Sequence, residues 1–131
     1  MPHTISNPPG LYDPVGSGYS HVAETSGDLV FIAGQGANDI TGRIASADFA
    51  GQVRKSLDNL RIALASVGLG FEHVVQLRTY IVGYDGDKLA VLTEQIRGIW
   101  GERPPTQTLT GVAALAPPDM LVEIDAIAVR P

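Results

Sequence analysis

The fold of this chain is decided by the stretch Met120-Leu-Val-Glu-Ile-Asp-Ala-Ile-Ala-Val129, which predicts a strand with two different faces. Its even positions are all apolar and can pack against helices; they are Met120, Val122, Ile124, Ala126 and Ala128. Its odd positions place Glu123 and Asp125 among apolar neighbours. Side chains two residues apart on a strand point to the same face, so both acids share one face. That face is too apolar to be only hydrated, which predicts packing against another copy of the chain.

Apolar and β-branched runs predict the other strands, and two helices lie between them. The strands are expected at 29–33, 74–82 and 106–112, after a short extended piece at 19–22. Apolar residues at spacings of three and four predict helices from Phe49 to Val67 and from Leu89 to Ile99. Helices of this length cover one face of a mixed sheet, so the expected class is α+β.

Polar residues and glycines predict where the two helices begin and end. Ser46 or Asp48 can cap the start of the first helix, and Asp87 can cap the second. Gly68 and Gly101 are expected to end them.

Composition limits the classes of function. A length of 131 residues predicts a single domain over 1–131, and 44% hydrophobic residues suit a globular core. The net charge of -5, with no basic stripe, argues against binding to nucleic acid. Cysteine is absent and the three histidines lack ligand spacing, so we expect no metal, no thiol chemistry and no cofactor.

The sequence also lacks the patterns of a membrane or secreted protein. No apolar run approaches the roughly 20 residues that span a bilayer. Residues 1–9 do not have the charged-then-apolar pattern of a signal peptide. We therefore expect a soluble, cytoplasmic protein without a membrane partner.

The N-terminal segment, residues 1–18, is rich in proline and glycine and is expected to form a loop. Such a loop could fold over a cleft and present Tyr12 or Asp13 to a ligand. It could equally pack only at the edge of an assembly.

Glu123 and Asp125 are the strongest candidates for chemistry. A carboxyl group near an apolar interface can donate or accept a proton near neutral pH. The alternative is a salt bridge between subunits, to Arg78 or Arg130. We favour the salt bridge for Asp125 and the chemical role for Glu123.

Four segments together resemble the Rid family, also called YjgF, of reactive-intermediate deaminases. They are residues 29–35, 52–60, 74–82 and 122–129, and the resemblance runs from about Tyr19 to the C-terminus. It implies a chorismate-mutase-like α+β fold and a barrel-like homotrimer with clefts between subunits. It also implies hydrolysis of enamines and imines, such as 2-aminoacrylate, to a keto acid and ammonia without a metal or organic cofactor.

The same resemblance implies roles for individual residues. A glutamate on the last strand, which places the attacking water, corresponds to Glu123. A tyrosine near the N-terminus, which lines the cleft, corresponds to Tyr19. A backbone group at a Gly-Gln turn contacts the substrate, which places Ala33, Gly34 and Gln35 at the site.

The family arginine that holds the substrate carboxylate is replaced in this chain. Gln107 takes its position, flanked by Thr106 and Thr108. Losing a charge-assisted pair should cost about 2 to 4 kcal/mol of carboxylate binding. Arg103, four residues upstream, could reach the cleft instead or remain a surface residue on the turn.

Two hypotheses about function remain open. The first is a hydrolase of an enamine or imine other than 2-aminoacrylate, in which Glu123 positions water and Gln107 contacts a neutral or amide-bearing substrate. The second is a trimeric small-ligand-binding protein without catalysis. Some members of the family are labelled endoribonucleases, but the acidic balance of this chain argues against RNA as its partner.

Overall fold

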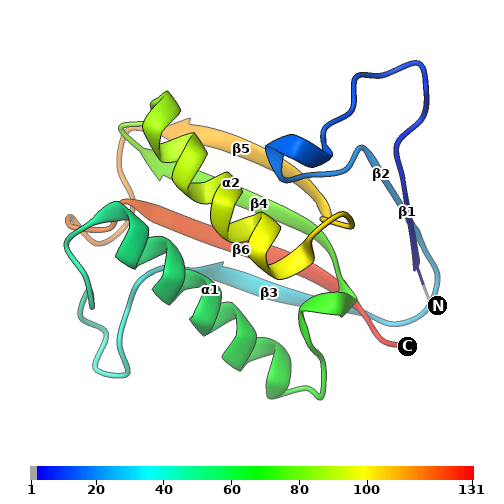
Figure 1. The fold of residues 1–131 in the computed structure, drawn as a ribbon. Helices are drawn as coiled ribbons and strands as arrows, with labels where there is room; N and C mark the ends of the chain where they lie inside the picture. The colour runs from blue at the N-terminus through cyan, green and yellow to red at the C-terminus, as the bar shows by residue number, and fades with distance from the viewer. Residues whose placement is uncertain (1–2) are drawn as a thin grey trace.

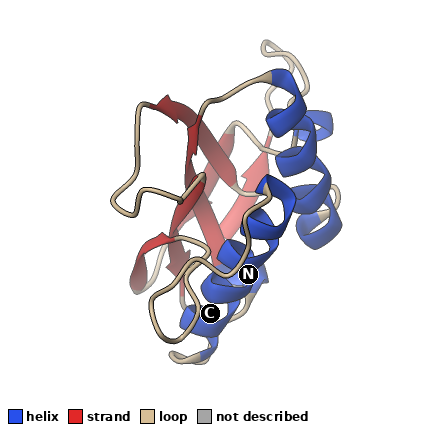
Figure 2. Ribbon diagram, turned by 90° about the vertical axis from the view of Figure 1, so that its left-hand side faces the viewer, coloured by secondary structure: helices blue, strands red, loops and turns tan. Residues whose placement is uncertain are grey.

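The computed structural model describes residues 3–131 and places two helices on one face of a mixed sheet (Figures 1 and 2). The sheet order is β3 (Leu29–Gln35), β6 (Val122–Val129), β4 (Val74–Val82) and β5 (Thr106–Val112). The β4–β5 pair is parallel and the other two pairs are antiparallel. The expected α+β class, with two helices over a mixed sheet, is confirmed.

Helices α1 (Phe49–Ala65) and α2 (Gly86–Trp100) lie on the same side of the sheet, as Figure 2 shows. The other side, which we call the open face, carries no helix in the described part of the chain. The alternation predicted for the last strand is confirmed, because Val122, Ile124 and Ala126 are buried in the core under the helices. Glu123 and Asp125 therefore lie on the open face.

The first helix begins at Phe49 as the sequence predicts but ends at Ala65, before the predicted Val67, and the cap of the second helix also differs. The Asp48 side chain accepts a hydrogen bond from the Gly51 N–H at 2.9 Å, and Gly68 takes a positive φ of 76° just beyond α1. Asp85, not Asp87, caps α2 by accepting from the Lys88 N–H. Asp87 lies in the first turn, where a negative charge favours the helix dipole without capping it.

A buried amide holds the start of β6 against α1. Gln52 is fully buried, and its Nε2 donates to the Ser46 and Asp119 carbonyls at 3.0 and 2.9 Å. Its Oε1 accepts from the Leu121 N–H at 2.8 Å. These bonds connect the loop before β6 to the first turns of α1, so they define where the last strand begins.

The N-terminal segment contains more regular structure than the expected loop. Strand β1 (His3–Ser6) pairs antiparallel with β2 (Val22–Thr25), and η1 (Val15–Ser17) is a short 3-10 turn. A second short turn, η2 (Phe71–His73), precedes β4. In Figure 1 the β1–β2 hairpin lies to one side of the main sheet, beyond the C-terminal end of α2. A four-residue strand with one partner strand has little periodic signal, which is why the sequence alone predicts only loop there.

Candidate functional site

The two acids of the last strand have different surroundings on the open face. Asp125 Oδ1 lies 3.0 Å from Arg78 Nε, and its Oδ2 lies 3.4 Å from the Tyr80 hydroxyl. This pairing and the negative charge of Asp125 raise the pKa of the Arg78 guanidinium. The ion pair is within one chain, so the expected pairing of Asp125 between subunits is corrected. Arg130, the other partner considered, donates instead to the Val67 carbonyl.

Glu123 has no such partner. Its side chain is half-buried, and it makes no hydrogen bond or ion pair among residues 3–131. It lies across the backbone of Gly34 on β3, because a Cβ added to Gly34 would come within 2.6 Å of Glu123 Cδ. A carboxylate that is partly removed from water and left unpaired is unusual in a protein and marks a candidate for chemistry.

Gly34 belongs to a bulge at the end of β3. Ile32 pairs with Ala126 and Gln35 pairs with Ile124, so the register shifts by one residue between them. The sequence analysis expected a turn at Ala33, Gly34 and Gln35, whereas all three lie within the strand. The Gln35 side chain donates back to the Ala33 carbonyl at 3.0 Å. A bulge leaves one residue outside the ladder, so it can offer backbone groups to a ligand beside Glu123. We call this arrangement the Glu123 half-site.

A second group of expected residues lies at the β5 edge of the sheet. Tyr19, Thr106, Gln107 and Thr108 all line one cavity of about 520 Å³, which we call the β5-edge pocket. The remaining lining residues are Ser20, His21, Val22, Ala23 and Gln76. None of the nine is a lysine or an arginine, so the pocket offers hydroxyl, amide and imidazole groups and no permanent positive charge.

Hydrogen bonds within the chain already use part of the Gln107 side-chain amide. Its Oε1 accepts from the Thr79 hydroxyl at 2.7 Å, and its Nε2 donates to the Gly18 carbonyl at 3.2 Å. Gln107 pairs with Leu77 in the β4–β5 ladder, which places its side chain on the helix side of the sheet. One amide hydrogen and one lone pair of oxygen remain for a ligand.

The N-terminal segment packs against the wall of this pocket. The rings of Tyr12, Tyr19 and His21 meet edge to face, with centroids 5.3 to 6.4 Å apart. His21 Nε2 lies 2.8 Å from the Tyr12 carbonyl. Asp13 is used locally, because its side chain accepts from the Val15 N–H. His21 was not among the residues expected at the site; its i, i+2 spacing from Tyr19 is the sequence signal that both can share the pocket wall.

Arg103 lies elsewhere. It lines a different cavity, formed by His3, η2 and the end of α2, and it is not among the residues of the β5-edge pocket. The two buried prolines that follow it, Pro104 and Pro105, separate it from Thr106. Within one chain it does not stand in for the missing arginine.

The Glu123 half-site and the β5-edge pocket do not meet within one chain. Glu123 is next to the β3 edge of the sheet, and Gln107 is on the strand at the opposite edge. Their side chains also point to opposite faces. Among residues 3–131 there is no cluster of His, Cys, Asp and Glu able to hold a metal ion, and no helix long and apolar enough to cross a membrane.

Comparisons of the sequence and of the fold with known proteins point to one protein family. The family model described as Endoribonuclease L-PSP matches residues 13–130. A crystal structure of YyfB from Yersinia pestis, described as a Rid family protein of unknown function, is 36% identical with a TM-score of 0.95. The alignment covers 99% of this chain and 100% of that one.

Two further relatives are more distant. Protein DfrA of Myxococcus xanthus is 33% identical, over 85% of this chain and 84% of its own length. A crystal structure of E. coli TdcF with bound serine is 32% identical with a TM-score of 0.69, covering 80% of this chain and 83% of that one. These matches and the fold show that the chain belongs to the Rid (YjgF) family, the family of the Endoribonuclease L-PSP model.

Proposed function

We propose that this protein hydrolyses an uncharged enamine or imine in clefts between the subunits of a homotrimer. At the level of the family, a deaminase acting on small molecules is supported. The observation that carries the proposal is the half-buried, unpaired carboxylate of Glu123, which lies against the Gly34 backbone. Asp125, two residues away, is paired and serves structure.

The separation of the Glu123 half-site from the β5-edge pocket, which together we call the two half-sites, supports a cleft between subunits. They lie near opposite edges of the sheet, so an assembly that brings the β3 edge of one chain to the β5 edge of the next would join them. The side of the sheet that carries Glu123 also exposes apolar side chains near that edge. Phe31 is 72% exposed and Leu29 is 46% exposed on β3, which favours burial against another copy.

The proposed reaction needs only water and a proton carrier. Glu123 accepts a proton from water as the oxygen attacks the imine carbon, and it returns that proton to nitrogen. The product of this addition is a carbinolamine. Glu123 then takes the proton of its hydroxyl group and gives it to nitrogen, so the carbon–nitrogen bond breaks and a carbonyl compound and ammonia are released. An enamine substrate first takes a proton on carbon and loses one from nitrogen, which converts it to the imine.

The lining of the β5-edge pocket sets the expected charge of the substrate. A carboxylate prefers a bidentate arginine, and the β5-edge pocket has no arginine or lysine in its lining. The remaining amide hydrogen of Gln107 and the threonine hydroxyls suit a carbonyl or amide group. TdcF, by contrast, is described with bound serine, which carries a carboxylate. We do not propose RNA as a substrate, because a net charge of -5 opposes binding to phosphates.

The test is ammonia release from two freshly generated substrates, 2-aminoacrylate and an uncharged ketimine. We expect wild type to hydrolyse the uncharged imine faster, and Glu123→Gln to lose about 100-fold or more in kcat/KM. Glu94→Gln, an exposed acid on α2, is the matched control and should keep full activity. Gln107→Arg should shift the preference towards 2-aminoacrylate.

Two results would overturn the proposal. Equal rates for Glu123→Gln and wild type would remove Glu123 from the chemistry. Absence of turnover with both substrates, together with saturable binding of the uncharged imine or its ketone, would favour the alternative of a binding protein without catalysis. That alternative rests on one observation, the occupation of Gln107 by Thr79 and Gly18.

A further inference from the structure

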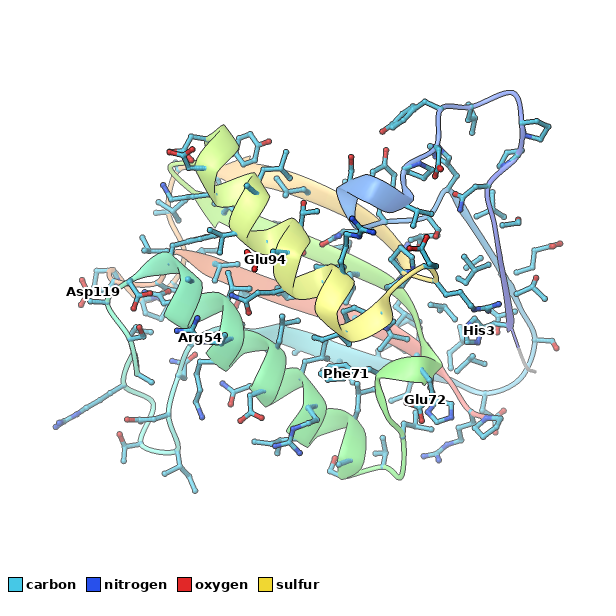
Figure 3. All side chains as sticks on the ribbon, viewed as in Figure 1. His3, Arg54, Phe71, Glu72, Glu94 and Asp119 are labelled. Carbon is cyan, nitrogen blue, oxygen red and sulfur yellow. The ribbon has the colours of Figure 1, made fainter. Side chains whose placement is uncertain are left out.

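A second cavity lies away from both half-sites, between β1, η2 and the C-terminal end of α2. It has a volume of about 390 Å³, and we call it the His3 pocket. Its lining residues are His3, Phe71, Glu72, Val74, Ile99, Trp100 and Arg103. Figure 3 labels three of them, His3, Phe71 and Glu72, on the side of the molecule where the hairpin approaches α2. It shares no lining residue with the β5-edge pocket.

His3 is the first unusual group in this pocket. The side chain belongs to β1 and only 5% of the residue is exposed, yet its Nδ1 has no hydrogen-bond partner among residues 3–131. A buried polar atom without a partner destabilises the folded protein. A ligand that supplies the partner would offset that cost, so the atom is an argument for a bound molecule.

Arg103 is the second unusual group in the His3 pocket. It is exposed at the mouth of the pocket and makes no ion pair or side-chain hydrogen bond in the described chain. Its guanidinium is close enough to lower the pKa of His3, adding to the larger effect of burial. The pocket thus has a fork of free N–H donors at its rim, the geometry that holds a carboxylate in a bidentate way.

The walls are apolar. Phe71 and Trp100 meet edge to face with centroids 5.2 Å apart, and Val74 and Ile99 complete the surface. The Trp100 indole N–H donates to the Phe71 carbonyl at 2.9 Å. Because that donor is used, the tryptophan offers only its ring to a ligand. An apolar wall beside a cationic rim matches a molecule with an apolar body and one anionic end.

Glu72 is the group that opposes an anion here. Its side chain is 71% exposed, so water screens its charge. It lies 3.6 Å from His73 Nδ1, but that nitrogen accepts the Gly70 N–H, so Glu72 has no neutralising hydrogen bond from His73. Glu72 therefore should weaken anion binding without preventing it, which makes it useful in a test.

We propose that the His3 pocket binds a small organic carboxylate with an aromatic or branched apolar body, its carboxylate on Arg103 and its apolar body against Trp100. The imidazole of His3 lies at the inner end and provides a further polar contact. The proposal is independent of the function assigned to Glu123, because the two sites share no residue.

The experiment uses the intrinsic fluorescence of Trp100, the only tryptophan in the chain. The intact protein is titrated with 3-phenylpropionate and, as the matched neutral probe, 3-phenylpropanamide. We expect saturable quenching or a spectral shift with the acid, and affinity at least about tenfold weaker for the amide.

Variants assign the interaction to individual residues. Arg103→Gln should lose about tenfold in affinity for the acid, whereas Arg43→Gln, an exposed arginine in a distant loop, should lose none. Glu72→Gln should bind the acid more tightly, because it removes a repelling charge. Thr108→Ala, in the β5-edge pocket, should bind as wild type does.

A pH series tests the part played by His3. Arg103 lines the same pocket as His3, Glu72 and His73 lie on η2, and Glu24 on β2 lies opposite the next residue of β1. A bound carboxylate favours the protonated ring, so affinity for the acid should rise as the pH falls from 7.5 to 6. His3→Phe should bind the acid with a smaller dependence on pH.

Three outcomes would overturn the proposal. The amide could bind as tightly as the acid, which would remove the role of charge. Arg103→Gln and Arg43→Gln could weaken binding equally, which would indicate general attraction to a charged surface. Thr108→Ala could abolish the signal, which would place the probe in the β5-edge pocket.

Discussion

The β5-edge pocket and the Glu123 half-site belong to the same sheet but satisfy their polar groups in different ways. In the pocket, Gln107 bonds to Thr79 and Gly18, and His21 lies against the Tyr12 carbonyl. At the other edge, Glu123 has no partner in the described chain and lies on a glycine that leaves room for it. An acid that is partly removed from water and has no partner is unfavourable, so such an acid is a candidate for use by another component.

The difference indicates which part of the proposed site one chain can build alone. The β5-edge pocket is closed by contacts within the protomer, including the aromatic cluster of the N-terminal segment. The Glu123 half-site lacks such closing contacts within residues 3–131, and we propose that the next subunit supplies them. Three substitutions test this comparison, and a fourth tests the His3 pocket outside it.

The largest effect is expected from Phe31→Asp. Phe31 is 72% exposed on β3, beside the proposed contact between subunits, and a charge there would be desolvated on assembly. We expect the trimer to dissociate and ammonia release to vanish, while the circular dichroism spectrum stays that of a folded protein. Light scattering measures the assembly. Ile40→Asp, at a fully exposed loop position, is the control; a trimer that survives Phe31→Asp would contradict the proposed contact.

The next effect is expected from Gly34→Ala. The added methyl group would lie 2.6 to 2.9 Å from atoms of the Glu123 side chain, which is flexible and can move away. We expect thermal stability close to wild type and kcat/KM lower by about 10- to 100-fold, because a small displacement of a reacting group is costly. Gly86→Ala, where no atom lies within 4 Å, is the control. Unchanged kinetics in Gly34→Ala would show that the position of Glu123 does not matter.

A smaller effect, on stability, is expected from Gln107→Leu. It leaves the buried Thr79 hydroxyl and the Gly18 carbonyl without their partner, at a cost of about 1 to 3 kcal/mol in the free energy of unfolding. Urea denaturation measures it. Thr108→Val, at an exposed neighbour, should change stability by less than about 0.5 kcal/mol. If Gln107→Leu is as stable as wild type, its amide is not a structural tie.

The smallest effect concerns His3, outside both half-sites. Burial, and then the charge of Arg103, lower the pKa of His3 below its usual 6.5. As the pH falls below about 6.5, the unfolded chain therefore binds more protons at this residue than the folded chain does, and stability decreases. We expect His3→Phe to lose less stability than wild type between pH 7.5 and 5.5 in urea denaturation. If the free energy of unfolding changed equally with pH in His3→Phe and in wild type, the effect assigned to His3 would be contradicted.

The alternation of β6 was predictable because it repeats over four buried positions, and the helical stripes repeat over several turns. Arg78 was named as a partner of Asp125, but the sequence did not show that the pair forms within one chain, because only the register of β4 against β6 brings these residues, 47 apart in the sequence, together. The cap of α2 was misplaced by two residues, since Asp85 and Asp87 have the same chemistry and differ only in backbone geometry.

The sequence predicted which residues belong to the candidate site, but it did not predict their positions in space or their hydrogen bonds. Tyr19, Thr106, Gln107 and Thr108 do share a pocket. An alignment assigns Gln107 a position but does not indicate that Thr79 and Gly18 occupy its amide. Nor does it indicate that Arg103 lines the His3 pocket instead, since both facts depend on packing between distant segments.

The buried Gln52 has a consequence for how this protein can evolve. A shift of β6 by one residue would exchange its faces, turning Glu123 into the core and Ile124 towards the open face. Gln52 hydrogen-bonds to the backbone of Asp119 and Leu121, just before β6 begins. These bonds favour the observed register of β6 over the shifted one. Substitutions in α1, remote from any substrate, could therefore switch the sheet between a surface that presents an acid and one that presents only hydrocarbon.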